Sequence, residues 1–138
     1  MIEKTWGTDR VMAHIASLDL WRGTPRVEPL IGGLTNLNFT VRDDAGVYVT
    51  RVAFDNPVHD IYQSHVATAM AAAAAAGISP RLHYMNGAIT VMDFAPGGAL
   101  RAGLFSDPAL LTASVHLLKR LHALGSNLPG PHAFGLRD

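Results

Sequence analysis

The sequence contains no cysteine, which excludes disulfide bonds, thiol nucleophiles and zinc sites built on cysteine. It also lacks an excess of charge of either sign, because 11 Lys and Arg residues balance 11 Asp and Glu residues. No net field therefore attracts the chain to nucleic acid or to an anionic membrane. No apolar run approaches the roughly 20 residues that span a bilayer, and the first residues, MIEKTWGTDR, contain no apolar signal core. We expect a soluble, cytoplasmic protein that binds neither nucleic acid nor a membrane.

Patterns typical of metal centres and hydrolase sites are missing as well. The 7 histidines never occur in the HExxH spacing or in a comparable ligand spacing. No Ser-His-Asp arrangement can be argued from the sequence either. We therefore expect no metal-ligating residue in this chain.

The pattern of apolar residues predicts a mixture of helices and strands in one domain, or in a piece of a larger one. Apolar residues from Val11 to Leu18 recur at helical spacing, which predicts a first helix that Thr8 caps and that ends near Leu20. Alanine-rich residues 60–76 predict a second helix.

Glycine, proline and capping residues mark the ends of the predicted helices. Gly77 and Pro80 stop the alanine-rich helix, because glycine favours the left-handed position after a helix and proline cannot continue one. A third helix is predicted to begin with Ser106 as its N-cap and Pro108 in its first turn, and to end at Gly125.

Five short runs read as strands. Three of them precede the alanine-rich helix and form a predicted antiparallel meander, and two follow it as a hairpin around Asn86-Gly87, a strong turn signal. The predicted strands are residues 27–31, 37–42, 47–53, 81–85 and 88–92.

The connection between the first two predicted strands, GGLTNLN from Gly32 to Asn38, combines glycine with polar side chains. Glycine lets a backbone approach a ligand closely, and N–H groups turned toward one point bind phosphate oxygens. Thr35, Asn36 and Asn38 add side-chain donors. The alternative is a plain hairpin turn, since Gly and Asn are common turn residues. The loop is neither a Walker A motif nor a Rossmann fingerprint, because no Lys-Ser/Thr pair follows and a strand comes next.

Arg51 is the most informative charge, because it shares a predicted strand face with Val47, Val49 and Ala53. A guanidinium that is buried among apolar side chains needs a polar or anionic partner. The alternative is an arginine near a strand end whose stem packs while its charged head reaches solvent.

Five motifs, taken in this order, resemble the choline/ethanolamine kinase group of the aminoglycoside phosphotransferase-like kinases. They are GGLTNLNFTV, YVTRVA, AAGISPRLHY, VMDFAPGGAL and LLKRLHAL. The resemblance implies an α+β fold of the protein-kinase-like type, whose small lobe has an antiparallel five-stranded sheet with one main helix and is followed by the first helices of a large lobe. It assigns residues 1–95 to this small lobe with an N-terminal helix, and residues 96–138 to a hinge and the beginning of an incomplete large lobe.

The resemblance also implies an ATP site. In the family, a basic residue at the position of Arg51 meets the nucleotide phosphates. Met92 would line the adenine pocket, the Asp93 carbonyl would accept from the base amino group, and the Ala95 N–H would donate to the ring. The predicted nucleotide-binding residues are Gly32, Gly33, Leu34, Thr35, Asn36, Asn38, Arg51, Met92, Asp93 and Ala95.

Two parts of the family pattern are absent from the chain. Kinase-like lobes pair the strand cation with a Glu on the next helix, yet no acidic residue occurs between Ile61 and Pro80, and Gln63 or His65 stands nearest the expected place. Phosphoryl transfer also needs an Asp that orients the acceptor hydroxyl, and Asn and Asp ligands for Mg²⁺. No residue of the chain matches these, so we predict no catalytic residue and expect residues outside this chain to hold Mg²⁺.

The implied function is that of an ATP-dependent phosphotransferase acting on a small-molecule hydroxyl, choline or ethanolamine first and an aminoglycoside or thiamine as alternatives. The chain would be the nucleotide-binding half and inactive alone. A non-catalytic nucleotide-binding or regulatory module is the alternative function, and a structural domain that binds a partner through an apolar helix is another. Leucines on more than one side of the third predicted helix lead us to expect self-association or a missing C-terminal lobe.

Overall fold

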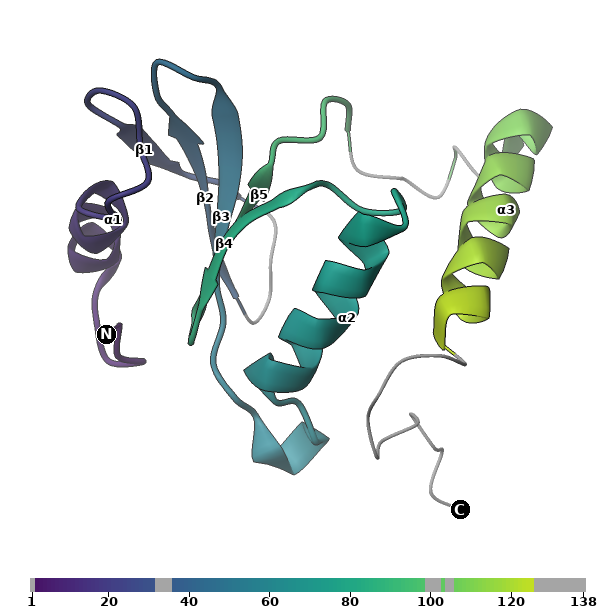
Figure 1. Ribbon diagram of the computed structural model, residues 1–138, viewed down its shortest axis with the longest axis horizontal. Coiled ribbons are helices and arrows are strands. Elements are labelled where there is room, and N and C mark those ends of the chain that lie inside the picture. The colour runs from purple at the N-terminus through teal and green to yellow at the C-terminus, as the bar shows by residue number, and fades with distance from the viewer. Residues whose placement is uncertain (1, 32–35, 99–102, 104–105, 126–138) are drawn as a thin grey trace.

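The computed structural model describes residues 2–31, 36–98, 103 and 106–125. These residues form one antiparallel sheet with helices on both of its sides (Figure 1). None of the helices in this part of the chain is long and apolar enough to cross a membrane.

The sheet has five strands in the order β1-β2-β3-β5-β4, and each neighbouring pair is antiparallel. The meander and the hairpin that the sequence predicts are therefore both confirmed, and β5 joins the hairpin to the meander through β3. The strands are β1 (Arg26–Pro29), β2 (Leu37–Arg42), β3 (Val47–Val52), β4 (Leu82–Asn86) and β5 (Ile89–Asp93).

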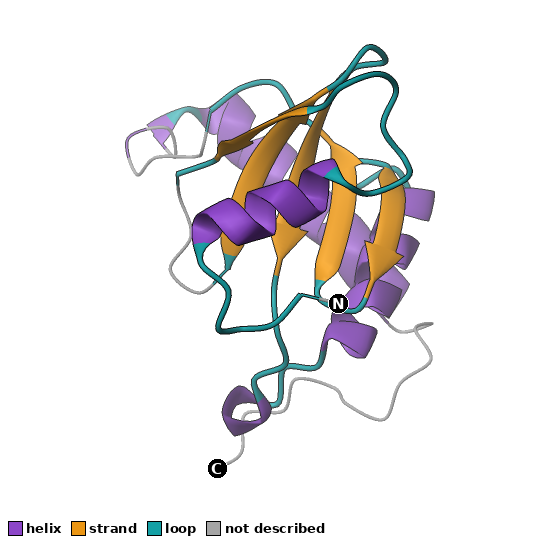
Figure 2. Cartoon of the chain, turned by 90° about the vertical axis from the view of Figure 1, so that its left-hand side faces the viewer, coloured by secondary structure: helices purple, strands orange, loops and turns teal. Residues whose placement is uncertain are grey.

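Helix α1 (Thr8–Ala16) crosses one face of the sheet, as Figure 2 shows from that side. Its Val11 and Ile15 are fully buried against alternate side chains of the central strands, because successive residues of a strand point to opposite faces. The indole N–H of Trp21 donates to the Ile15 carbonyl (2.7 Å) and holds the following loop in place. The core on this face consists of Ile2, Val11, Ile15, Phe39, Val41, Val52, Ile89 and Val91.

The ends of α1 differ from the prediction. Gly7 occupies the N-cap position and Thr8 is the first helical residue, with no side-chain cap hydrogen bond. The helix ends at Ala16 rather than near Leu20, because the Ser17 hydroxyl donates to the His14 carbonyl (2.9 Å) and the chain continues in a tight turn.

Helix α2 (Gln63–Ala75) covers the opposite face and packs against β4 (Figure 1). It begins three residues later than predicted, because a short 3₁₀ turn, η1 (Pro57–His59), precedes it and the Asp55 carboxylate accepts from the Gln63 N–H (2.7 Å). The predicted stop at Gly77 is confirmed: its φ is 65°, and its N–H donates to the Ala74 carbonyl (3.0 Å).

Helix α3 (Pro108–Gly125) lies beside α2, and the Arg120 guanidinium donates to the Ala76 carbonyl (2.8 Å). Its first residue is Pro108, as predicted, but Asp107 rather than Ser106 caps it. The Asp107 carboxylate accepts from the Ala109 N–H (2.8 Å). Both residue types can cap a helix, and Asp107 prevails because the proline at the first position directly follows it.

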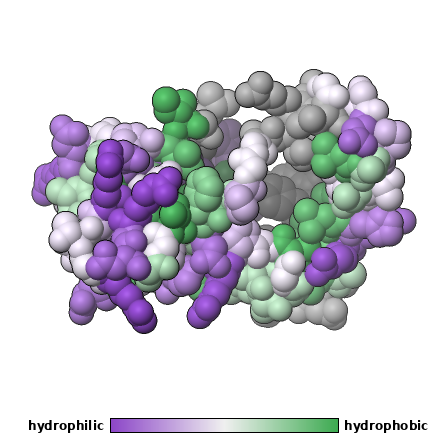
Figure 3. Space-filling model, turned by 90° about the horizontal axis from the view of Figure 1, so that it is seen from above, coloured by the Kyte–Doolittle hydropathy of each residue, from purple (hydrophilic) through white to green (hydrophobic). Residues whose placement is uncertain are grey.

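Several large apolar side chains of α3 reach solvent. Seen from above, strongly hydrophilic residues gather on the side of the sheet and α1, and hydrophobic residues show both near the middle of this face and on the side where α3 stands (Figure 3). The exposed apolar side chains of this helix are Leu111, Val115, Leu117, Leu118 and Leu121.

Candidate nucleotide site

The candidate site lies on the sheet face that α2 covers. Arg51 in β3 is directly opposite Asn38 in β2 and Thr90 in β5, and Thr90 is in turn opposite Met85 in β4. Residues opposite each other in an antiparallel pair point to the same face. These four side chains therefore form one row across the sheet, with the arginine in the middle.

A second row runs beside the first, two residues along each central strand. It pairs Thr40 with Val49, Val49 with Met92, and Met92 with Leu82. Val49 and Met92 therefore lie on the same face as Arg51. The two rows are about 6–7 Å apart along the strands, which is the length of two residues. The structure brings Asn38, Arg51 and Met92 of the predicted site together on one surface.

The charge of Arg51 is not compensated within the described part of the chain. Its side chain is half-buried, and its Nη1 contacts the Sδ of Met70 on α2 at 3.8 Å. The described residues place no carboxylate within ion-pairing distance of it, since their ion pairs join Arg26 to Glu28 and His83 to Asp93. The family pairs this strand cation with a helix Glu, whereas here the cation contacts the uncharged sulfur of Met70.

Gln63 and His65, which stand nearest the expected place of the family's helix Glu, are engaged at the start of α2. The Gln63 side-chain amide donates to the Phe54 carbonyl (3.0 Å), and the His65 ring lies edge-on to Tyr62. The residue of α2 that contacts Arg51 is Met70, further along the helix. Met70 lies four residues after Val66, on the same helical face, and this spacing is the sequence signal that could have identified it.

The predicted hinge begins at the opposite end of the sheet from the glycine-rich connection. Phe94 donates its N–H to the Val47 carbonyl (3.2 Å), which ties the end of β5 to β3. The Asp93 carboxylate binds His83 Nε2 (2.5 Å). Its side chain is therefore occupied, and a base could use only its backbone. Ala95 is exposed just beyond it.

An aromatic contact chain links this hinge end to the N-terminal part of the fold. The His83 ring lies edge-on to Tyr48 (5.0 Å between centroids), and Tyr48 contacts Trp21 (5.6 Å). A register shift between Leu82 and Tyr84 in β4 makes room for His83 to turn toward Asp93. Sequence patterns did not predict this cluster, since its members are far apart along the chain.

Part of the predicted phosphate loop, Gly32, Gly33, Leu34 and Thr35, lies outside the described residues. Its two arms are described: the Leu30 N–H donates to the Asn38 carbonyl (2.8 Å), and Asn36 is half-buried. The connection therefore leaves the sheet at the end nearest to Arg51. Asp93 lies toward the other end, three residues beyond Thr90, the partner of Arg51, and so about 10 Å from Arg51 along the strands.

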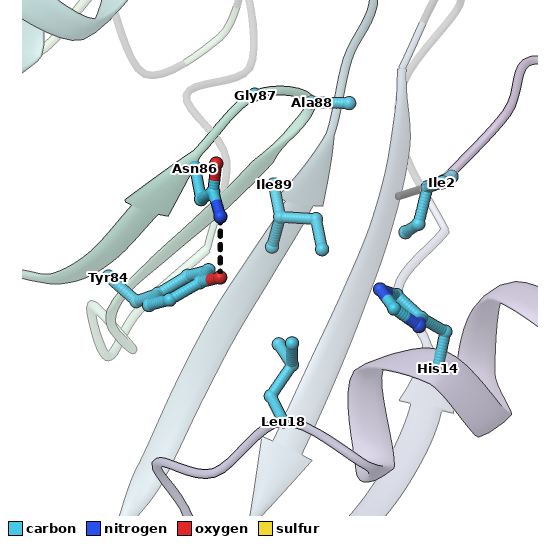
Figure 4. A pocket seen from close by; sticks show the side chains of 8 residues that line it. All are labelled: Ile2, His14, Leu18, Tyr84, Asn86, Gly87, Ala88 and Ile89. Atoms are coloured by element: carbon cyan, nitrogen blue, oxygen red, sulfur yellow. Dashed lines mark hydrogen bonds between the residues drawn. The ribbon is translucent and has the colours of Figure 1, made fainter.

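Two surface hollows lie near the β4-β5 turn, and the second reaches the Met85 end of the Arg51 row. One, of about 320 Å³, opens between α1 and this turn, where the Asn86 amide donates to the Tyr84 hydroxyl (Figure 4). The other, of about 760 Å³, opens below the start of α2 and is lined by Asp55 and Met85 among others. Neither hollow is lined by Arg51 or Met92. No group of three or more His, Asp or Glu residues within the described ranges could hold a metal ion.

No protein-family model matches the chain, and no curated protein sequence matches it either. An ethanolamine kinase of Plasmodium vivax has a similar structure, with a TM-score of 0.56 at 17% sequence identity. The match covers 77% of this chain and 32% of that kinase, so the chain spans about a third of the length of the protein it matches. At this identity the likeness concerns the fold. The chain therefore has a mixed α+β fold that is similar to part of a small-molecule kinase.

Proposed function

We propose that the chain is the nucleotide-binding part of an ATP-dependent small-molecule kinase that transfers phosphate to an alcohol. The observation that carries this proposal is the position of Arg51, a half-buried cation without a carboxylate partner in the described residues, on the sheet face between the glycine-rich connection and the hinge. The similarity of the fold to an ethanolamine kinase supports it.

The proposed ligand pose follows from the two rows of side chains. Val49 and Met92 provide an apolar surface for adenine next to the backbone of Asp93 and Ala95. Arg51 binds phosphate oxygens, for which its planar, permanently charged fork is suited. Asn38 beside it and the loop from Gly32 to Asn36 add further donors. The lobe in this proposal comprises residues 1–95, and residues 96–138 begin the part that follows the hinge.

Catalysis in this proposal needs groups that the chain does not supply. Positioning and electrostatic stabilisation of the phosphoryl group account for nearly all of the rate enhancement in this reaction class. Residues outside this chain would hold Mg²⁺ and orient the acceptor, for which we propose choline or ethanolamine, with aminoglycosides or thiamine as alternatives. The isolated chain would then bind ATP without transferring its phosphate.

Backbone amide shifts measured by NMR during titration with a non-hydrolysable ATP analogue test the proposal. We expect the largest changes at residues 32–38, at Arg51 and at residues 92–95. Changes confined to α3 would contradict it. Adenosine, titrated separately, should shift the hinge residues while leaving Arg51 largely unchanged.

The exposed apolar side chains of α3 favour one alternative, a non-catalytic module that binds a partner. A partner-binding module without nucleotide affinity would show no shift in the titration above. It would instead associate through α3, either with itself or with a C-terminal lobe on another chain. Binding of ATP at the Arg51 face would exclude a partner-binding module that has no affinity for nucleotides.

A further inference from the structure

The β4-β5 turn contains the pair Asn86-Gly87, which the proposed function does not use. Asn86 is the last residue of β4, and its side chain is exposed. Gly87 follows it outside the strand ladder, with a φ of 55°. Within the described residues, the Gly87 N–H has no hydrogen-bond partner. The turn therefore places an exposed side-chain amide directly before a backbone nitrogen that no ladder hydrogen bond holds.

The space around this peptide group is open. A Cβ built on Gly87 would meet nothing within 4 Å, and glycine itself has no Cβ, so nothing shields the nitrogen from the preceding side chain. The Asn86 Nδ2 donates to the Tyr84 hydroxyl at 3.2 Å, which is at the long end of the range for such bonds (Figure 4). This contact holds the amide weakly, and the amide can turn toward the glycine nitrogen.

We propose that Asn86 is a site of covalent modification, at which the amide converts to aspartate and isoaspartate without an enzyme. Asparagine is among the thermally labile residues. The Gly87 nitrogen bonds to the Asn86 Cγ, the Cγ–Nδ2 bond breaks, and the Gly87 proton leaves with Nδ2 as ammonia, which gives a five-membered succinimide ring. Water then opens the ring. Breaking the new bond between the Gly87 nitrogen and Cγ gives aspartate, and breaking the original peptide bond gives isoaspartate.

The modification would change the turn in charge and in geometry. A carboxylate only accepts hydrogen bonds, so the bond that Asn86 donates to Tyr84 would be lost. Asn86 and Gly87 line both surface hollows, so a negative charge would appear on the rim of each, and Asp55 also lines the larger one. Isoaspartate adds a carbon to the main chain and would disturb the pairing of Asn86 with Ile89.

Peptide mapping of the purified 138-residue chain tests the proposal. Trypsin cleaves after Arg81 and Arg101 and releases residues 82–101, in which Asn86 is the only asparagine or glutamine. After incubation at physiological temperature, and relative to an unincubated sample, we expect this peptide to gain the mass difference between an NH₂ and an OH group. The aspartate and isoaspartate forms have equal mass, so chromatography should resolve them as two peaks. Fragmentation should place the change at residue 86.

A synthetic peptide of residues 82–92 measures the reactivity of the same sequence without the fold. We expect the chain to accumulate both modified forms while this peptide converts completely. A chain that stays unmodified over that time would overturn the proposal, because the fold would then keep the amide away from the glycine nitrogen.

Two controls separate ring closure from simple hydrolysis of an exposed amide. Asn56 is an internal control, because Pro57 follows it and has no N–H to lose. Equal conversion at Asn56 and Asn86 would overturn the proposal. Asn86→Gln keeps a side-chain amide at the exposed position but would need a larger ring, so the variant should lose the mass gain, and its retention would also overturn the proposal. These measurements involve no nucleotide, so their outcome is independent of the proposed function.

Discussion

Arg51 shows, at the scale of a single residue, which neighbours of a side chain can be predicted from the sequence and which cannot. Val49 two residues earlier shares its face, and Asn38 and Thr90 lie on either side of it. The sequence indicated the arginine and its face from strand alternation alone. It did not indicate the contact with Met70, because a contact between a strand and a helix depends on where the helix begins and how it crosses the sheet.

Replacement of Arg51 by Met should weaken ATP binding roughly tenfold or more while leaving adenosine binding nearly unchanged. The expected loss corresponds to about 1.5–3 kcal/mol for hydrogen bonds of a charged group to phosphate. Titration calorimetry with both ligands measures it. An equal loss for ATP and adenosine would mean that Arg51 supports the fold rather than the phosphates.

Thr50 is fully buried on the α1 face, and its hydroxyl has no hydrogen-bond partner among the described residues. Replacement by Val removes this unsatisfied group at nearly constant shape, so the free energy of unfolding should rise by about 1 kcal/mol. Urea denaturation measures the change. Thr90→Val, on the opposite face, is the control and should give no comparable gain. A loss of stability in Thr50→Val would show that the hydroxyl is satisfied.

Asp43 should make the stability depend on pH. The backbone N–H of Arg22, together with those of Ala45 and Gly46, lowers the pKa of its carboxyl below the ordinary value of 3.8. A depressed pKa in the folded state stabilises the fold above the unfolded pKa, and this contribution disappears as the pH falls through the folded value. Asp43→Asn should therefore be less stable than the unsubstituted chain at pH 7, and the difference should shrink below about pH 4. Urea midpoints at several pH values measure it, and a constant difference would contradict the prediction.

At the scale of elements, the sequence predicted the five strands and three α-helices of the described residues, and the errors concern their ends and the 3₁₀ turn before α2. Strand alternation and the Asn86-Gly87 turn are local signals, which is why the sheet was predictable. Helix starts depend on which of two neighbouring polar residues becomes the cap, as Ser106 and Asp107 show. Asp55, which receives the first N–H of α2, lies eight residues before it, across a turn that propensity does not reveal.

Gly77 is the residue on which the end of α2 depends most. Its φ of 65° is strained for any residue with a Cβ, although a Cβ there would meet nothing within 4 Å. Gly77→Ala should therefore lower the free energy of unfolding by about 1 kcal/mol through backbone strain alone. Thermal denaturation measures it, with Gly46→Ala as a control in which the added Cβ meets only ordinary contacts. Equal stability of Gly77→Ala would mean that the helix ends without the left-handed turn.

At the scale of the whole molecule, the described residues form one sheet with its buried core on the α1 face, and α3 carries apolar side chains that face solvent. Leu111 and Leu118 lie two turns apart on α3, and Leu118 is 51% exposed. Covering such leucines stabilises an association by up to about 1.5–3 kcal/mol for each side chain. The purified chain should therefore self-associate at high concentration, and the double variant Leu111→Gln and Leu118→Gln should be closer to a monomer in light scattering. A monodisperse monomer of the unsubstituted chain at high concentration would contradict this prediction.

The aromatic contacts between Trp21, Tyr48 and His83 have a spectroscopic consequence. His83 also binds Asp93, so a ligand that shifts the backbone of the proposed hinge should change the surroundings of the Trp21 indole. The chain has 2 tryptophans, and Trp6→Phe leaves Trp21 as the single emitter. Its emission would then report occupancy of the proposed hinge from a residue outside the proposed site, and a titration would need neither label nor radioisotope.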